Sequence, residues 1–260
     1  MSRTSVHLAV DPTNPGQFFA CCGLLELADR LWSGAEGWFV ADQFAFGPLA
    51  SSTREEVLLA DLISAIAKAD LEQMDEADET ASPLRLNSAF GLRLDWWREP
   101  SASAMKLWAG RMNSTRIARA MQNALVGALA DPERLLDHAA VVYEPSEPDK
   151  KVEPFYFDAR RGASATALDI GFMPDALSMT ALAFPAVEFL CLVGLQRFRP
   201  TQVKVRVFDY ATWTQPLDTR VAPLAAASLL DLPGARTYRF EVQFRTDQRK
   251  HKAFTSATPL

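Results

Sequence analysis

Residues 11–32 constrain the fold more than any other part of the chain. They begin with a turn that contains two prolines and a glycine, and they continue as a largely apolar run. Asn14 suits the N-cap of a helix, and Pro15 suits the first helical position, where a missing N–H group is not needed. Apolar side chains then recur at helical spacing up to Trp32. We expect a tight turn followed by a buried helix, with a strand at residues 6–10 before it.

The rest of the chain divides into short strands and helices. Apolar, aromatic or alternating runs predict strands at residues 38–46, 155–157, 202–210 and 238–244. Apolar periodicity and capping residues predict helices at residues 53–69, 103–130, 185–198 and 222–230, and another that begins at Asp131. Alternation over residues 84–96 fits a hairpin or one bent strand equally well. Charged or small residues predict loops at 70–79 and 158–169 and a linker at 144–153.

This pattern predicts an α+β protein in which mixed short strands pack against helices. With 260 residues, the chain fits one large domain or two small ones. We expect an α+β part at residues 1–150, which holds the longest helix, and a second α+β part at residues 151–260 that shares its core. A single domain is the alternative description.

Composition and hydropathy indicate a folded cytoplasmic protein without a membrane segment. Hydrophobic residues make up 48% of the chain and charged residues 23%, as in ordinary globular domains. The most apolar stretch, at residues 181–195, is shorter than the roughly 20 residues that a membrane-spanning helix needs. The start of the chain lacks the apolar core of a signal peptide. Three cysteines in apolar surroundings favour buried, reduced thiols over disulfides.

The sequence offers little for catalysis, so we expect no enzyme, no metal and no cofactor. The three histidines lie far apart in the chain, and none has the spacing of a zinc site. A phosphate-binding glycine loop and a nucleophile elbow are both missing. Cys21 and Cys22 lie inside the apolar helix, where packing is a better interpretation than reactivity.

Charge is distributed unevenly, which matters more than the net charge of −5. Residues 1–80 carry four basic and fourteen acidic side chains, whereas residues 81–260 carry twenty-three and eighteen. Nucleic-acid binding follows local potential rather than total charge, so the later part of the chain can contact phosphate. A solvated surface with uneven charge is the alternative interpretation.

Several basic groups in this later part are candidate nucleic-acid contacts. Arg116 and Arg119 share one face of the predicted long helix with Asn113 in reach, so they can follow a phosphate backbone or form a polar helix face. Arg160 and Arg161 precede small residues, and paired guanidinium groups can bind phosphate in a fork. Basic residues interleaved with aromatic residues can contact phosphates and stack on bases, although strand aromatics also form cores. These further candidates are Lys204, Arg206, Arg245, Arg249, Lys250 and Lys252.

The opening segment, DPTNPGQFFACCGLLELADRLW, resembles the amino-terminal signature of a CRISPR-associated family of subtype I-G, formerly I-U, the Csb-three family. The similarity is most specific at Asp11, Asn14, Pro15, Gly16, Gln17, Ala20, Gly23, Leu24, Leu25 and Glu26. Weaker similarity runs through residues 155–165 and 185–200.

This resemblance implies a non-catalytic, large-subunit-like component of the Cascade effector in antiviral defence. Its implied partners are CRISPR RNA (crRNA), target DNA, the backbone and RNA-processing subunits, and a helicase-nuclease recruited on target binding. Guide pairing would read the sequence, so the protein would need only shape, phosphate and short-motif contacts. The alternatives are a repeat-RNA endonuclease of the same superfamily and a protein-binding scaffold for an acidic partner.

The order of strand, glycine-containing loop and helix also resembles a ferredoxin-like, repeat-associated RNA-binding core, here with a helical insertion. By that analogy, Asn14, Gly16 and Gln17 would bring backbone N–H groups to a phosphate at the start of the helix. The alternative is that these residues only shape the turn.

Overall fold

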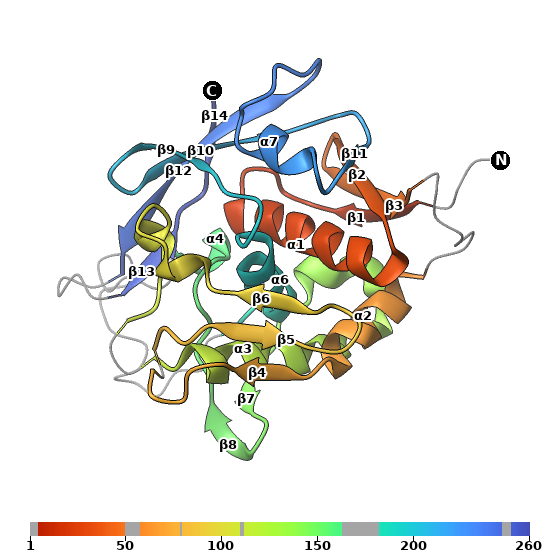
Figure 1. Cartoon of the computed structure of the whole chain (residues 1–260). Helices are drawn as coiled ribbons and strands as arrows, with labels where there is room; N and C mark the ends of the chain where they lie inside the picture. The colour runs from red at the N-terminus through yellow and green to blue at the C-terminus, as the bar shows by residue number, and fades with distance from the viewer. Residues whose placement is uncertain (1–4, 50–57, 79, 110–111, 163–181, 246–250) are drawn as a thin grey trace.

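The computed structural model describes residues 5–49, 58–78, 80–109, 112–162, 182–245 and 251–260. Helix α1 (Pro15–Trp32) runs through the middle of the molecule, with β1–β3 on one side and α6 (Pro185–Gly194) on another (Figure 1). One buried core includes residues from Leu8 to Ala257, so residues 1–150 and 151–260 share it. Within the described ranges, no helix is both long and apolar enough to cross a membrane.

The strands form antiparallel sheets, and the expected α+β class is confirmed. The first sheet has the order β1-β3-β2-β11, from strands Val6–Ala9, Gln43–Pro48, Ala35–Val40 and Leu217–Asp218. The second has the order β13-β12-β10-β9, from Lys252–Phe254, Arg236–Phe244, Val207–Thr212 and Thr201–Lys204, and β14 (Thr258–Pro259) also pairs with β12. The third has the order β4-β5-β6, from Leu71–Gln73, Leu84–Leu86 and Leu92–Leu94.

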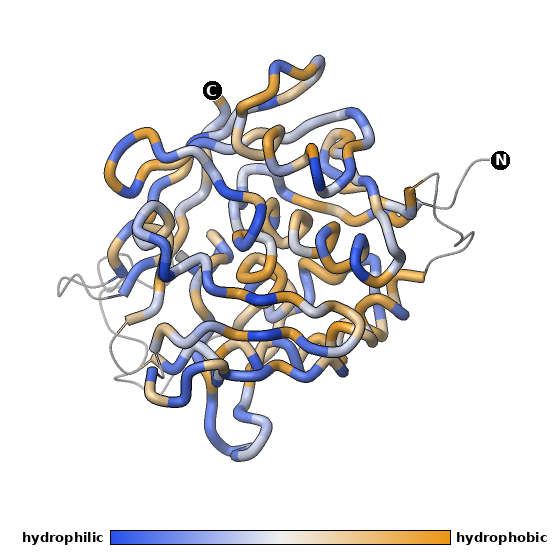
Figure 2. Tube along the Cα trace, in the orientation of Figure 1, coloured by the Kyte–Doolittle hydropathy of each residue, from blue (hydrophilic) through white to orange (hydrophobic). Residues whose placement is uncertain are grey.

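The remaining elements are helices, short 3₁₀ segments and a hairpin. The helices are α2 (Leu59–Lys68), α3 (Ser114–Ala124), α4 (Ala159–Gly162) and α7 (Ala222–Ala226). Short 3₁₀ segments lie at Trp96–Arg98, Ser103–Met105, Leu125–Ala130 and Pro132–Asp137. Strands β7 (Tyr143–Glu144) and β8 (Glu147–Lys151) form a hairpin, which is hydrophilic in Figure 2.

Helix α1 begins where its capping residue and its proline predict. The Asn14 side chain accepts a hydrogen bond from the N–H of Gly16, and Pro15 begins the helix. Helices α1 and α6 cross in close contact because glycines face each other there. A Cβ atom on Gly23 would lie 2.0 Å from the carbonyl oxygen of Leu190, and one on Gly194 would lie 2.0 Å from that of Phe19.

Part of the first sheet has the succession of elements expected at the start of a ferredoxin-like core. The succession β1-α1-β2-β3 with the order β1-β3-β2 is the first half of that βαββαβ topology. No strand of the described residues pairs with the open edge of β1, and β11 extends the other edge. A complete ferredoxin-like sheet is therefore not formed in this part of the chain.

Three strand predictions were wrong because turns interrupt the expected runs. Residues 38–46 belong to the hairpin β2–β3, which turns at Ala41 with a φ of 51°. Residues 202–210 form the hairpin β9–β10, which turns near Arg206 with a φ of 61°. Residues 155–157 are buried but form no strand, since Tyr156 has a φ of 73°.

Other predicted strands agree better with the structure. Strand β1 and strand β12 confirm the predictions at residues 6–10 and 238–244. Residues 84–96 contain the hairpin β5–β6, which decides between the two alternatives.

The predicted long helix at residues 103–130 was also wrong. Among the described residues of this range, Ser114–Ala124 alone is α-helical, because Asn113 caps a helix that begins there. The Trp108 indole donates to Thr80 O at 2.7 Å, which holds the preceding segment against another part of the molecule. The helix predicted from Asp131 is a 3₁₀ segment. Residues 144–151 of the expected linker belong to the hairpin β7–β8.

Several predicted elements are present but begin or end at other residues than expected. The helices predicted at 53–69, 185–198 and 222–230 are present but shorter, and the Thr53 cap lies outside the described residues. The loop expected at 70–79 contains β4, and the loop expected at 158–169 begins with α4 before the described range ends.

Candidate nucleic-acid interface

A buried polar network joins the turn before α1 to α4 and α6. It consists of Asn14, Asp158 and Glu188, which are at most 2% exposed. The amide of Asn14 donates to the Asp158 carboxylate at 2.9 Å, and its oxygen accepts from the N–H groups of Gly16 and Ala159 at 3.1 Å. Glu188 accepts two backbone N–H groups, from Phe157 and Asp158. Burial, with the nearby charge of Asp158, raises the pKa of Glu188 to about 7.

The other turn residues are also used inside the molecule. A Cβ atom on Gly16 would lie 2.3 Å from the carbonyl oxygen of Phe157, so this glycine permits close packing. The side chain of Gln17 accepts from the N–H of Asp11 at 2.7 Å. Asn14, Gly16 and Gln17 therefore shape and anchor the start of α1, as in the alternative that the sequence leaves open.

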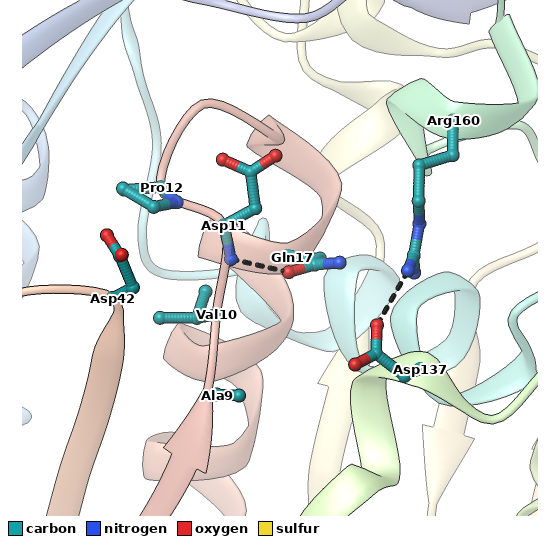
Figure 3. Close-up of a pocket in the computed structure, with 8 residues that line it drawn as sticks. All are labelled: Ala9, Val10, Asp11, Pro12, Gln17, Asp42, Asp137 and Arg160. Atoms are coloured by element: carbon teal, nitrogen blue, oxygen red, sulfur yellow. Dashed lines mark hydrogen bonds and ion pairs between the residues drawn. The ribbon is translucent and has the colours of Figure 1, made fainter.

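A pocket of about 440 Å³ lies beside this turn and is drawn in Figure 3. The side chains of Asp11, Asp42 and Asp137 line it together with Arg160. Arg160 is already engaged, since its guanidinium group pairs with Asp137 and Asp158 and lies 3.5 Å from the centre of the Phe184 ring. Three carboxylates against one paired cation disfavour phosphate, so we leave Arg160 out of the interface.

The face of α3 carries arginines that bind within the chain. Arg119 donates to the carbonyl oxygen of Leu71 through two nitrogen atoms, at 2.9 and 3.0 Å. Arg116 forms an ion pair with Glu144, and Asn113 caps the helix by accepting from the N–H of Arg116 at 2.9 Å. These residues line a pocket between α3 and the β7–β8 hairpin and form no continuous basic stripe.

Five cations from separate segments gather near the paired ends of β12 and β13, on the left of the molecule in Figure 1. We call them the basic cluster. They are all half-buried, and they are Lys106, Arg161, Arg206, Arg245 and Lys252. Four of them were predicted from the sequence. Lys106 was missed, although its position two residues before Trp108 repeats the combination of base and aromatic residue seen elsewhere.

Backbone pairing brings these segments together. Phe244 of β12 pairs with Lys252 of β13, and the N–H of Arg245 donates to His251 O at 2.8 Å. The N–H of Lys252 donates to Leu107 O at 3.2 Å, which attaches the segment of Lys106.

Two further backbone hydrogen bonds hold the segments of Arg206 and Tyr156 against β12 and β13. The N–H of Val242 donates to Arg206 O at 2.9 Å, and the N–H of Phe254 donates to Tyr156 O at 3.2 Å. Residues separated by over 100 positions in the chain thus share one region.

Aromatic rings hold the guanidinium groups of the basic cluster. The guanidinium carbon of Arg245 lies 3.4 Å from the centre of the Tyr156 ring, and that of Arg161 lies 5.9 Å from it. Arg206 lies 4.6 Å from the centre of the Phe244 ring. Such stacking orients an arginine without using its hydrogen-bond donors.

Four of the five cations in the basic cluster lack a carboxylate partner within the described residues. None of the ion pairs between described residues involves Lys106, Arg206, Arg245 or Lys252. The buried Nε atoms of Arg206 and Arg245 have no hydrogen-bond partner in the described part of the chain. Burial, together with the charges of Arg206 and Lys106, lowers the pKa of Lys252 to about 8. An anion bound here would relieve this repulsion.

Two groups of predicted contacts lie elsewhere or cannot be placed. Lys204 is exposed on β9, two residues before Arg206. Arg249 and Lys250 fall outside the described residues.

Comparisons with known proteins give no match, so the site is interpreted from its own residues. No family model matches the chain, and neither a curated protein nor a solved structure matches it. Among the residues that the structure describes, no group of three or more histidine, cysteine, aspartate and glutamate side chains could hold a metal ion. The basic cluster is therefore the arrangement on which we base a function.

Proposed function

We propose that the protein is a non-catalytic, nucleic-acid-binding subunit of a type I-G CRISPR surveillance complex, and that the basic cluster contacts crRNA or target DNA. The observation that supports this most is the gathering of five cations, four of which, Lys106, Arg206, Arg245 and Lys252, form no ion pair with a described residue. Phosphate would supply the missing charge, and guanidinium groups bind it in a fork.

The geometry of the basic cluster favours phosphate contacts over base recognition. The rings of Tyr156 and Phe244 already stack on arginines, and Tyr156 is only 5% exposed, so it offers little surface to a base. Backbone contacts are independent of sequence, which suits a complex in which guide pairing selects the target.

The CRISPR setting is supported by the resemblance of residues 11–32, which lie in the turn and α1 and away from the basic cluster. The cytoplasmic location and the partners follow from that setting. These partners are the crRNA, the target DNA, the backbone and RNA-processing subunits, and the helicase-nuclease.

The first prediction tests the basic cluster. We expect the double variant Arg206→Gln and Arg245→Gln to bind single-stranded RNA at least tenfold more weakly, because two phosphate contacts are lost. The slope of log affinity against log salt concentration should fall by about 1.4, which is about 0.7 for each of the two contacts with a single strand. Fluorescence anisotropy at several salt concentrations measures both quantities.

The matched control is the double variant Arg85→Gln and Arg220→Gln, which removes the same charge from exposed positions outside the basic cluster. Equal losses in the two double variants would show that only total charge matters and would overturn the proposal. RNA and effector subunits that co-purify with the tagged protein would support the CRISPR setting. Binding with only an acidic protein would favour the scaffold instead.

One observation favours the endonuclease alternative. The lowered pKa of Lys252, about 8, approaches the range that suits general acid–base catalysis, and His251 is its neighbour in the chain. Cleavage of repeat RNA by the isolated protein, lost in Lys252→Met, would replace our proposal. Intact RNA after prolonged incubation would retain it.

A further inference from the structure

A pocket of about 350 Å³ lies where α3 begins, beside the β7–β8 hairpin. It shares no residue with the basic cluster. Its lining includes Asn113, Thr115 and Arg116 from the start of α3, and Glu144 from β7. A volume of this size fits a small molecule.

Thr115 is the residue that points to a ligand. It lines the pocket, is only 2% exposed, and its hydroxyl group has no hydrogen-bond partner in the described part of the chain. Buried hydroxyl groups in folded proteins nearly always have a partner, and leaving one unpaired is unfavourable. A ligand acceptor in the pocket would satisfy this group.

The start of α3 favours an anionic ligand. The helix has 11 residues, and the N–H groups of a first turn have no acceptor within the helix. The positive end of the helix dipole adds to this preference, and helix N-termini are common phosphate sites. Asn113 uses its side-chain oxygen for the cap, which leaves its amide group to donate to a ligand.

The ion pair between Arg116 and Glu144 shows that this position accommodates an anionic group. Its guanidinium group pairs with the carboxylate of Glu144, so a carboxylate already sits where a ligand anion would bind. A phosphate that binds Arg116 in a fork would compete with this single carboxylate. Arg119, which also lines the pocket, adds positive charge while it donates to Leu71 O.

We propose that this pocket binds a phosphomonoester. The phosphate group accepts from the Thr115 hydroxyl, the Asn113 amide and Arg116, and it displaces Glu144. The volume left over takes the group to which the phosphate is attached. The inference does not depend on the basic cluster or on the CRISPR setting.

Isothermal titration of the full chain tests this second prediction, with inorganic phosphate, a nucleoside 5′-monophosphate and the nucleoside without phosphate as probes. We expect saturable binding of the first two and none of the nucleoside. Tighter binding of the monophosphate than of inorganic phosphate would show that the attached group also fits. Absence of saturable binding by both phosphate probes would overturn the inference.

Single substitutions in the pocket test where the phosphate group binds. Thr115→Val and Arg116→Gln should each weaken binding by roughly tenfold or more, because each removes a donor to a charged acceptor. Glu144→Gln should strengthen it several-fold, because the competing carboxylate is lost, whereas a purely structural pocket gains nothing from this change. Arg220→Gln is the control for the positive charge removed in Arg116→Gln, and thermal melts show which variants are folded.

The double variant Arg206→Gln and Arg245→Gln separates this inference from the proposed function. Unchanged phosphate binding in that variant supports the pocket. If that variant loses binding while Thr115→Val and Glu144→Gln leave it unchanged, the phosphate binds the basic cluster and the inference is wrong.

Discussion

The buried polar network and the basic cluster both gather polar side chains, but they differ in charge. The network contains two carboxyl groups, whereas the basic cluster contains five basic side chains. In the network, the cap, the carboxylates and the backbone N–H groups satisfy one another, so that Asn14, Asp158 and Glu188 can be buried. In the basic cluster, burial and the nearby charges of Arg206 and Lys106 lower the pKa of Lys252. Groups whose partners lie within the described part of the chain serve the fold, whereas Arg206 and Arg245, whose buried Nε atoms have no partner there, are better placed to bind an anion.

The comparison also separates the residues that carry the family resemblance from those proposed to bind nucleic acid. The residues that resemble a family signature lie in the turn and in α1, where they pack and cap. The residues that best fit a nucleic-acid contact lie outside residues 11–32, although Arg161 falls within the weaker similarity at residues 155–165. A signature of this kind can thus be required for the shape of a protein while another surface does the binding.

The largest expected effect lies at the crossing of α1 and α6, which carry the network residues Asn14 and Glu188 at their starts. Gly23→Ala should lower the free energy of unfolding by about 4 kcal/mol, because its Cβ would overlap a backbone carbonyl. Urea denaturation measures the loss.

Gly91→Ala is the control for this third prediction. Gly91 has a φ of 56° and nothing within 4 Å of an added Cβ, so alanine there suffers only backbone strain of about 1 kcal/mol. Equal losses in the two variants would show that the helices do not cross as closely as described.

The next effect concerns the pH dependence of the network. Burial raises the pKa of Glu188 from 4.5 to about 7, so the folded state binds a proton more tightly than the unfolded state. The stability contributed by Glu188 is therefore present at low pH and is lost as pH rises from about 4.5 to 7. Glu188→Gln cannot titrate and should lack this loss.

The free energies of unfolding of the protein and of Glu188→Gln, measured at pH 5 and pH 8, check this fourth prediction. Their difference should shift in favour of the variant at pH 8, by on the order of 3 kcal/mol at most. A difference that does not change with pH would show that Glu188 titrates at its ordinary value.

The smallest effect concerns the basic cluster. Because the pKa of Lys252 is about 8, this side chain carries a proton only part of the time at pH 8. A bound phosphate raises that pKa, so binding should take up about half a proton at this pH. Calorimetry in two buffers that differ in ionisation enthalpy measures the uptake. Lys252→Arg should bind RNA without uptake, and equal uptake in both proteins would place the titrating group elsewhere.

Local signals explain which elements could be predicted from the sequence. The cap at Asn14, the proline after it and the apolar period lie within α1 itself, and this helix was predicted correctly. Residues 103–130 have good helix propensity, but Trp108 is held by a distant carbonyl group, and tertiary contacts decide the structure there. Residue types do not reveal the left-handed backbone at Tyr156 that interrupts the strand predicted there.

The candidate site could be predicted only as a set of residue types. Charge and aromatic neighbours selected Arg161, Arg206, Arg245 and Lys252, but their convergence depends on strand pairing between distant segments. The same reasoning selected Arg116 and Arg119. Their partners, Glu144 and the carbonyl oxygen of Leu71, come from segments that are not neighbours in sequence.

The position of α1 also has a consequence for how the chain folds during synthesis. Helix α1 is buried on nearly all sides, and its cover includes α6 and Tyr210, whose hydroxyl donates to Pro12 O across 198 positions. The N–H of Ala257 donates to Thr13 O. A growing chain therefore exposes the apolar surface of α1 until most of the protein has been translated. We expect slow, late folding that depends on chaperones to shield this helix on the ribosome.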